Sequence, residues 1–395
     1  MSDPRDLPDA DALRARGSLK WTGMPADIAA WVAESDLGVA PAVTEAVQAA
    51  VADGLLGYLP PAIRRGLGEA FASWAEHAYG WQVEPRRVRP VGHVTEALRV
   101  AIDLFSRPGS PVILPTPAYM PFVTAPTVWG RQVLQVPMAS DDRGRATIDL
   151  AALDEAFRAG GQLLVLVNPH NPTGRVADRA ELAAVAEVVE RHGGRVFADE
   201  IHAPLVYSPG RHVPYASVSP ATAAHTITGV SASKAWNLPG LKCAQVVLTN
   251  DADLATWQRD SDLLSEGAST VGAIANAAAY TAGRDWLTGT LAYLDGNRRA
   301  VADVLAEAAP QVGYRLPEGT YLAWLDLRAA LAELPADAGP GAEPLGSWLR
   351  RTTGVATTDG ALCGGAGVGH VRLNLAMPRP LVVEAGRRIA ARLDR

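Results

Sequence analysis

Three polar motifs in the chain could serve one chemical site. They are NPHNPTG at 168–174, DEIH at 199–202 and SASK at 231–234. The Lys234 amine could form a Schiff base with a carbonyl group, and the hydroxyls of Ser231 and Ser233 could donate to a phosphate. Asp199 is the residue type that pairs with the pyridinium nitrogen of pyridoxal phosphate. These residue types together predict a pyridoxal phosphate site.

Further residues could complete such a site. The segment GHVT at 92–95 opens a predicted helix, whose free backbone N–H groups could bind a phosphate. Asn171 could donate to a phenolate oxygen, and Tyr119 could stack on an aromatic ring. No His or Cys pair has zinc-ligand spacing together with further ligands, so no metal site is expected.

Short apolar runs that alternate with helical patterns define the elements that must position these motifs. Candidate strands lie at 111–115, 162–167, 195–199, 225–230 and 243–249. Between the second and the third of them, apolar residues recur at helical spacing before Gly193. Strand, helix and strand in this order predict βαβ units and a largely parallel sheet. Ligands bind outside the carboxyl ends of strands in such sheets, so the three motifs should meet at one edge.

The remaining patterns suggest how the chain divides. We expect an N-terminal arm with part of a small domain at 1–49, a large cofactor-binding domain at 50–290 and a small C-terminal domain at 291–395. A long helix is predicted from about residue 286, with Gly296 as a kink or hinge, and an amphipathic helix closes the chain.

Composition restricts the class of protein. The 395 residues include 36 Lys and Arg against 42 Asp and Glu, so no basic field favours nucleic acid or an anionic membrane. No uncharged apolar run approaches the length of a membrane span. The charged start lacks the apolar core of a secretory signal, and two cysteines cannot form a disulfide framework. A cytoplasmic globular enzyme is expected.

Motifs along nearly the whole chain also resemble a known family. Those that carry the resemblance are KWTGMPADIAAWVAESDLGVAPAV at 20–43, GLLGYLPP at 54–61, PTPAYMPF at 115–122, NPHNPTGRV at 168–176, ADEIHAPLVY at 198–207, SASKAWNLPGLKCAQ at 231–245, GTYLAWLDL at 319–327 and VRLNLAMP at 371–378. The chain resembles fold-type I pyridoxal-phosphate enzymes of the class I/II aminotransferase superfamily, in particular the MalY/PatB cystathionine β-lyase (C–S lyase) branch. The resemblance implies an α/β fold with a mostly parallel seven-stranded sheet in a large domain, plus a small α+β domain.

The resemblance also implies roles for residues around the cofactor ring. Lys234 would hold pyridoxal 5'-phosphate and then move the substrate α-proton. Asp199 would keep the pyridine nitrogen protonated, and Tyr119 would stack on the ring; these three form the expected catalytic set. Asn171 and His202 would contact the ring hydroxyl.

Other roles concern the phosphate and the substrate. The residues expected around the phosphate are His93, Val94, Ser231, Ser233 and Lys242. Tyr58 would reach the site from the partner subunit of a homodimer. Arg372 would bind the substrate α-carboxylate, with Asn171 and Tyr58 nearby.

Several of these residues also have a purely structural interpretation. Asp199 could cap a helix, and Asn171 could serve only the turn in NPTG. His93 and His202 could be satisfied structural histidines, and Arg372 could belong to an ion pair. Tyr58 could pack in a core or an interface.

The expected function is α,β-elimination from a cysteine S-conjugate, with cystathionine as the default substrate of the resemblance. A thiol, pyruvate and ammonia would be the products. The alternative is an aminotransferase, which shares the chemistry up to removal of the α-proton and then passes the amino group to a 2-oxo acid. A third possibility, a non-catalytic regulator on this fold, is disfavoured by the intact set of Lys234, Asp199 and Arg372.

Overall fold

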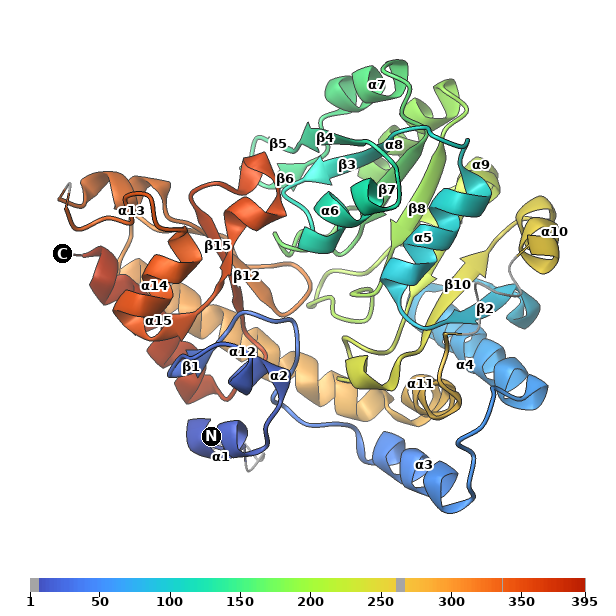
Figure 1. Ribbon diagram of the computed structural model, residues 1–395, viewed down its shortest axis with the longest axis horizontal. Helices are drawn as coiled ribbons and strands as arrows, with labels where there is room; N and C mark the ends of the chain where they lie inside the picture. Colours follow the sequence, from blue (N-terminus) through green and yellow to red (C-terminus); the bar gives the residue numbers. More distant parts are fainter. Residues whose placement is uncertain (1–6, 261–266, 336, 395) are drawn as a thin grey trace.

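The computed structural model describes residues 7–260, 267–335 and 337–394, and its centre is a seven-stranded sheet (Figure 1). The strands run in the order β2 (Val88–Val91), β10 (Ala244–Leu248), β9 (Thr226–Val230), β8 (Arg195–Asp199), β7 (Leu163–Val167), β3 (Val112–Thr116) and β4 (Val133–Pro137). Only β10 runs antiparallel to its neighbours. The predicted α/β fold with a mostly parallel seven-stranded sheet is therefore confirmed.

The five strands expected from apolar runs are the inner strands β3, β7, β8, β9 and β10, whose residues are almost all buried. The two strands that were not predicted, β2 and β4, lie at the two edges of the sheet. An edge strand needs less apolar sequence because part of it faces solvent. The sequence VRPV of β2 and the half-exposed β4 therefore lack the continuous apolar signal.

Helices cover both faces of this sheet. Alternate residues of β7 belong to two separate apolar clusters, one on each face of the sheet. One cluster contains residues of α5 (Val94–Phe105) and α10 (Asp251–Asp260). The other contains residues of α7 (Leu150–Arg158) and α8 (Arg179–Arg191). A third cluster joins α3 (Pro41–Ala52), α4 (Pro61–Tyr79) and α11 (Thr270–Ala282). The short helix α6 (Met120–Val128) follows β3, and the short helix α9 (Pro220–His225) precedes β9.

A smaller antiparallel sheet lies beside the large one. Its strands are β11 (Gly313–Tyr314), β12 (Leu322–Asp326), β15 (His370–Asn374) and β14 (Thr358–Asp359). Residues of α12 (Arg284–Ala308), α13 (Arg328–Glu333), α14 (Leu345–Thr353) and α15 (Arg379–Leu393) share its apolar core. Helix α12 continues through Gly296, where a kink was expected. A Cβ at that glycine would lie 2.5 Å from Arg379 Nη2, so the glycine makes room for the Arg379 side chain.

The N-terminal arm lies against the smaller sheet (Figure 1). It contains α1 (Ala10–Ala15), α2 (Leu19–Thr22) and β1 (Ile28–Ala29), and β1 pairs with β13 (Val355–Ala356). The fully buried Lys20 pairs with Asp36 within the arm, at 2.7 Å between Nζ and Oδ2, and its Nζ also donates to Ala376 O at 3.2 Å, which ties the arm to the segment after β15. The division of the chain at residues 49 and 290 remains a prediction.

No helix in the described ranges is long and apolar enough to cross a membrane.

Candidate active site

The three motifs follow three adjacent strands of the large sheet at their carboxyl ends. Residues 168–174 come after β7, Asp199 is the last residue of β8, and residues 231–234 come after β9. The arm and the smaller sheet close the site from the other side. Ala33 O accepts a hydrogen bond from Lys234 Nζ at 2.8 Å and another from Tyr321 Oη at 3.0 Å.

Lys234 has the properties of a reactive amine. Burial, together with the nearby charge of Arg372, lowers the pKa of Lys234 to about 8, although Asp199 and Glu34 oppose this shift. The chain has only two other lysines. Lys20 is fully buried in its ion pair with Asp36, and Lys242 is exposed. Lys234 is thus the lysine placed to attack a carbonyl at ordinary pH.

Asp199 is a buried carboxyl group at the end of β8. Its Oδ1 accepts a hydrogen bond from Ile201 N at 3.1 Å, and burial raises the pKa of Asp199 to about 7. A buried carboxylate is stable only when a cation or several donors accompany it. A protonated pyridine nitrogen would supply such a partner.

Arg372 is a buried cation bound by neutral groups. Its side chain is about 1% exposed, Nη1 lies 2.9 Å from Asn171 Oδ1, and Nη2 lies 3.0 Å from Trp31 O and 3.2 Å from Thr358 Oγ1. These oxygens take three of the five N–H groups of a guanidinium. Nε has no partner among the described residues. The remaining Nη1 N–H faces the weak acceptor Met120 Sδ at 3.8 Å. The Nε N–H is therefore the unpaired donor from which a substrate carboxylate could accept.

His202, Tyr119 and Asn171 lie around the same space. Burial, together with the charges of Lys234 and Arg372, holds the pKa of His202 well below its usual value, and its Nδ1 has no partner in the described part of the chain. Tyr119 precedes α6, and burial raises its pKa, with smaller effects of Arg372 and Asp199. Because Asn171 gives its carbonyl oxygen to Arg372, its amide Nδ2 is the group that remains as a donor.

The residues expected around the phosphate have structural contacts of their own. His93 is exposed and caps α5, where its Nδ1 accepts from Glu96 N at 3.0 Å. Val94 is the first residue of α5. Backbone N–H groups in the first turn of a helix have no partner within it and can bind an anion. Ser231 Oγ donates to Cys243 O at 2.8 Å and accepts from Ser233 N at 3.0 Å.

Two predicted residues lie at the surface. The Lys242 side chain is exposed, and the residue adopts a left-handed conformation with φ 48° next to Cys243. Tyr58 is 98% exposed, so it does not reach the site of its own subunit. The residues present fit pyridoxal phosphate: Lys234 for its aldehyde, Asp199 for its ring nitrogen, His202 and Asn171 for its hydroxyl, and the start of α5 with Ser231 and Ser233 for its phosphate.

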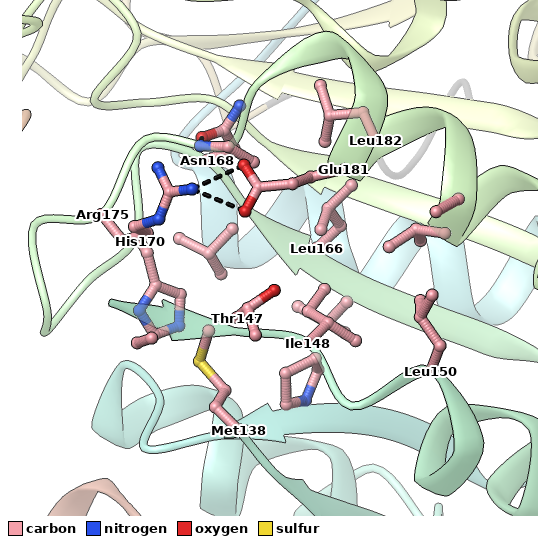
Figure 2. Close-up of a pocket in the computed structure, with 17 residues that line it drawn as sticks. Met138, Thr147, Ile148, Leu150, Leu166, Asn168, His170, Arg175, Glu181 and Leu182 are labelled. Atoms are coloured by element: carbon pink, nitrogen blue, oxygen red, sulfur yellow. Dashed lines mark hydrogen bonds and ion pairs between the residues drawn. The ribbon is translucent and has the colours of Figure 1, made fainter. Parts of the chain in front are cut away.

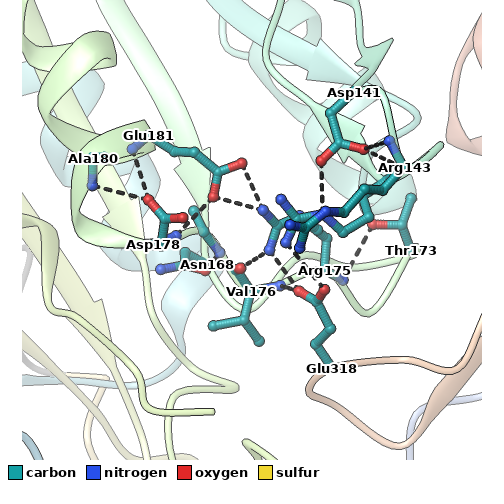
Figure 3. A network of polar contacts seen from close by, with 12 residues as sticks. Asp141, Arg143, Asn168, Thr173, Arg175, Val176, Asp178, Ala180, Glu181 and Glu318 are labelled. Atoms are coloured by element: carbon teal, nitrogen blue, oxygen red, sulfur yellow. Dashed lines mark hydrogen bonds and ion pairs between the residues drawn. The ribbon is translucent and has the colours of Figure 1, made fainter.

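A network of charged residues fixes the loop after β7. Arg175 Nη2 lies 2.6 Å from both carboxylate oxygens of Glu181 (Figure 2). Arg175 Nη1 lies 2.5 Å from Glu318 Oε2, which also accepts from Val176 N at 2.9 Å (Figure 3). Glu318 precedes β12 of the smaller sheet, so this network ties the loop that carries Asn171 to the smaller sheet.

The sequence interpretation missed the contribution of the arm. The backbone oxygens of Trp31 and Ala33 bind Arg372 and Lys234, and the Glu34 carboxylate interacts with Lys20 and Lys234. Backbone carbonyls leave no signal in a sequence. Glu34 belongs to the motif near the start of the chain that ends at Val43, and this position was the one sequence feature that could have indicated a role for the arm in the site.

Known proteins share this architecture over the whole chain. The chain is 37% identical over 388 residues to a cystathionine beta-lyase of Corynebacterium glutamicum, an alignment that covers 98% of this chain and 99% of the relative. The structure of the PLP-bound C–S lyase from Staphylococcus hominis is 27% identical, with a TM-score of 0.88 and 98% of each chain covered. Cystalysin from Treponema denticola, whose structure contains pyridoxal 5'-phosphate, is 25% identical, with a TM-score of 0.88 and 98% of each chain covered.

The family model for aminotransferase class I and II matches residues 32–389. This match includes all the predicted site residues, from Tyr58 to Arg372. The chain therefore belongs to the aminotransferase class I and II family.

Proposed function

We propose that this protein is a pyridoxal phosphate-dependent carbon–sulfur β-lyase that converts a cysteine S-conjugate, such as cystathionine, into a thiol, pyruvate and ammonia. The observation that carries the proposal is the juxtaposition of Lys234, Asp199 and a buried Arg372 that lacks a carboxylate partner among the described residues. The full-length similarity to a cystathionine beta-lyase supports the choice of reaction.

Different residues of the site bind the substrate and move its proton. Pyridoxal phosphate, when bound, supplies an aldehyde that links to amino groups and a ring that accepts electrons from the substrate Cα. Arg372 binds the α-carboxylate and orients the Cα–H bond. The Lys234 amine then takes the Cα proton, which its lowered pKa favours at neutral pH.

Elimination follows from this proton transfer. The Cβ–S bond breaks, its electron pair leaves with sulfur, and a thiolate departs. A thiol has a pKa near about 8.5, so the thiolate is a good leaving group. Hydrolysis of the remaining three-carbon fragment yields pyruvate and ammonia.

Transamination is the second candidate, because the matched family takes its name from it. The same residues serve both reactions up to removal of the α-proton, and the two differ in whether a β-substituent leaves.

The experiment that separates the two reactions is to incubate the purified protein with pyridoxal phosphate and L-cystathionine and to measure pyruvate and thiol. Equal amounts of both without an added 2-oxo acid support the lyase. Turnover that requires a 2-oxo acid and releases no thiol supports the aminotransferase. Lys234→Ala is the inactive control.

We also propose that the protein is a homodimer. Tyr58 is 98% exposed, and the apolar residues Leu56 and Val51 near it are 67% and 52% exposed. An exposed apolar group of this kind is typical of a surface that a partner covers, and Tyr58 would then approach the site of the partner subunit. Sedimentation velocity tests this, since a fully active monomer would contradict it. A cytoplasmic location stays a prediction.

A further inference from the structure

A cavity lies outside the candidate active site, on the α8 side of strand β7 (Figure 2). Its volume is about 150 Å³. Besides β7 and α8, it is bordered by the segment around the hairpin of β5 (Ala139–Ser140) and β6 (Ala146–Thr147). None of the predicted site residues lines it. Its occupant would therefore be distinct from the amino-acid substrate and from the cofactor.

The cavity has an apolar body and one polar end. Aliphatic side chains such as Met138, Ile148 and Leu166 form most of the wall. Asn168, Arg175 and Glu181 lie together at the other end in Figure 2. A space with this division suits a molecule that is apolar apart from one polar group.

The charged groups at the polar end are already paired with groups of opposite charge. The Arg175 guanidinium is already bound to the carboxylates of Glu181 and Glu318 (Figure 3). Burial lowers the pKa of His170 to about 4, so this lining residue is neutral at pH 7. A charged ligand would lose its hydration without gaining an ion pair, and an uncharged one is therefore favoured.

Two buried donors at the polar end lack acceptors. Asn168 is 2% exposed and Arg175 is 8% exposed, and neither Asn168 Nδ2 nor Arg175 Nε has a partner among the described residues. Asn168 Oδ1, by contrast, accepts from Ala177 N at 3.0 Å. Buried donors in native proteins are nearly always paired, so an unpaired one calls for an absent acceptor.

We propose that this cavity is a binding site for a small uncharged organic molecule with a compact apolar body and one hydrogen-bond acceptor. An apolar cavity of about 150 Å³ is large enough for a benzene-sized molecule. Asn168 and His170 belong to the loop that carries Asn171, which binds Arg372. The occupant would thus contact the active-site loop from behind.

Benzyl alcohol, which has an aromatic body and one hydroxyl oxygen, is a suitable probe. It is titrated into the holoenzyme by calorimetry, and the complex is located by crystallography. Ala184→Leu fills the cavity from α8, whereas Ala183→Leu places the same side chain on the same helix at a residue that does not line it. We expect wild type and Ala183→Leu to bind alike, and Ala184→Leu to bind at least about tenfold more weakly.

Asn168→Asp tests the polar end, because it keeps the oxygen that accepts from Ala177 and replaces the donor. We expect this variant to bind about fivefold more weakly, the effect of one hydrogen bond. The proposal is overturned if wild type does not bind the probe, if Ala184→Leu binds it as well as wild type does, or if the probe lies elsewhere in the crystal. Unchanged affinity of Asn168→Asp would overturn the requirement for an acceptor.

Discussion

Replacement of Arg372 by lysine tests the assignment of the carboxylate-binding residue. Three neutral oxygens and Met120 Sδ contact the guanidinium, and Nε has no partner in the described part of the chain and is available to the substrate. Lysine keeps the positive charge but cannot present two parallel donors. The variant therefore loses about one charge-assisted hydrogen bond, worth about 1.5–3 kcal/mol. We expect kcat/KM for L-cystathionine to fall roughly 10- to 150-fold.

The assay measures pyruvate formation across substrate concentrations with wild type, Arg372→Lys and a control. Arg379→Lys is the matched control, because Arg379 begins α15, which packs with the smaller sheet, and binds Asn297 and Tyr293, away from the site. We expect its kcat/KM to stay within about twofold of wild type. The visible absorbance of bound cofactor should be unchanged in both variants. A loss below about threefold for Arg372→Lys, or an equal loss in the control, would refute the assignment.

Three further predictions concern charge. The lowered pKa of Lys234 makes its amine about one-tenth neutral at pH 7 and about nine-tenths neutral at pH 9. The apoenzyme should therefore bind pyridoxal phosphate about tenfold faster at pH 9 than at pH 7, as measured by stopped-flow absorbance. A binding rate that does not change with pH would contradict this. The raised pKa of Asp199 means that the folded apoenzyme binds more protons than the unfolded chain between about pH 4 and 7. The free energy of unfolding of the wild-type apoenzyme, measured with urea, should therefore fall as pH rises through that window. In Asp199→Asn this fall should be absent. Parallel pH profiles for the two proteins would count against the prediction. Lys20→Met leaves Asp36 buried without its cation and should lower the free energy of unfolding by about 3–5 kcal/mol, whereas a loss under about 1 kcal/mol would argue against a buried pair.

The sequence predicted the inner part of the fold and the motifs on it because both depend on local signals. Fully buried strands such as β7 and β9 need unbroken apolar runs, and the turns after them carry the polar residues. The half-exposed edge strand β4 has no such run and was missed.

The closing of the site could not be predicted, because it depends on contacts between distant parts of the chain. Lys234 and Ala33 are about 200 positions apart, and Arg372 and Trp31 more than 300. Every residue has a backbone carbonyl, so a hydrogen bond to one does not restrict the type of that residue. These contacts therefore leave no pattern in the sequence. The exposure of Tyr58 likewise could not be derived from its residue type.

The most direct test of the central claim is to find which lysine carries the cofactor. The chain has three, Lys20, Lys234 and Lys242. Borohydride reduction of the holoenzyme fixes pyridoxal phosphate on the lysine it is bound to, and peptide mass mapping then locates it. We predict the mass increase on Lys234 alone, and its loss in Lys234→Ala. A label on Lys20 or Lys242, or no label on a protein that still produces pyruvate, would contradict it.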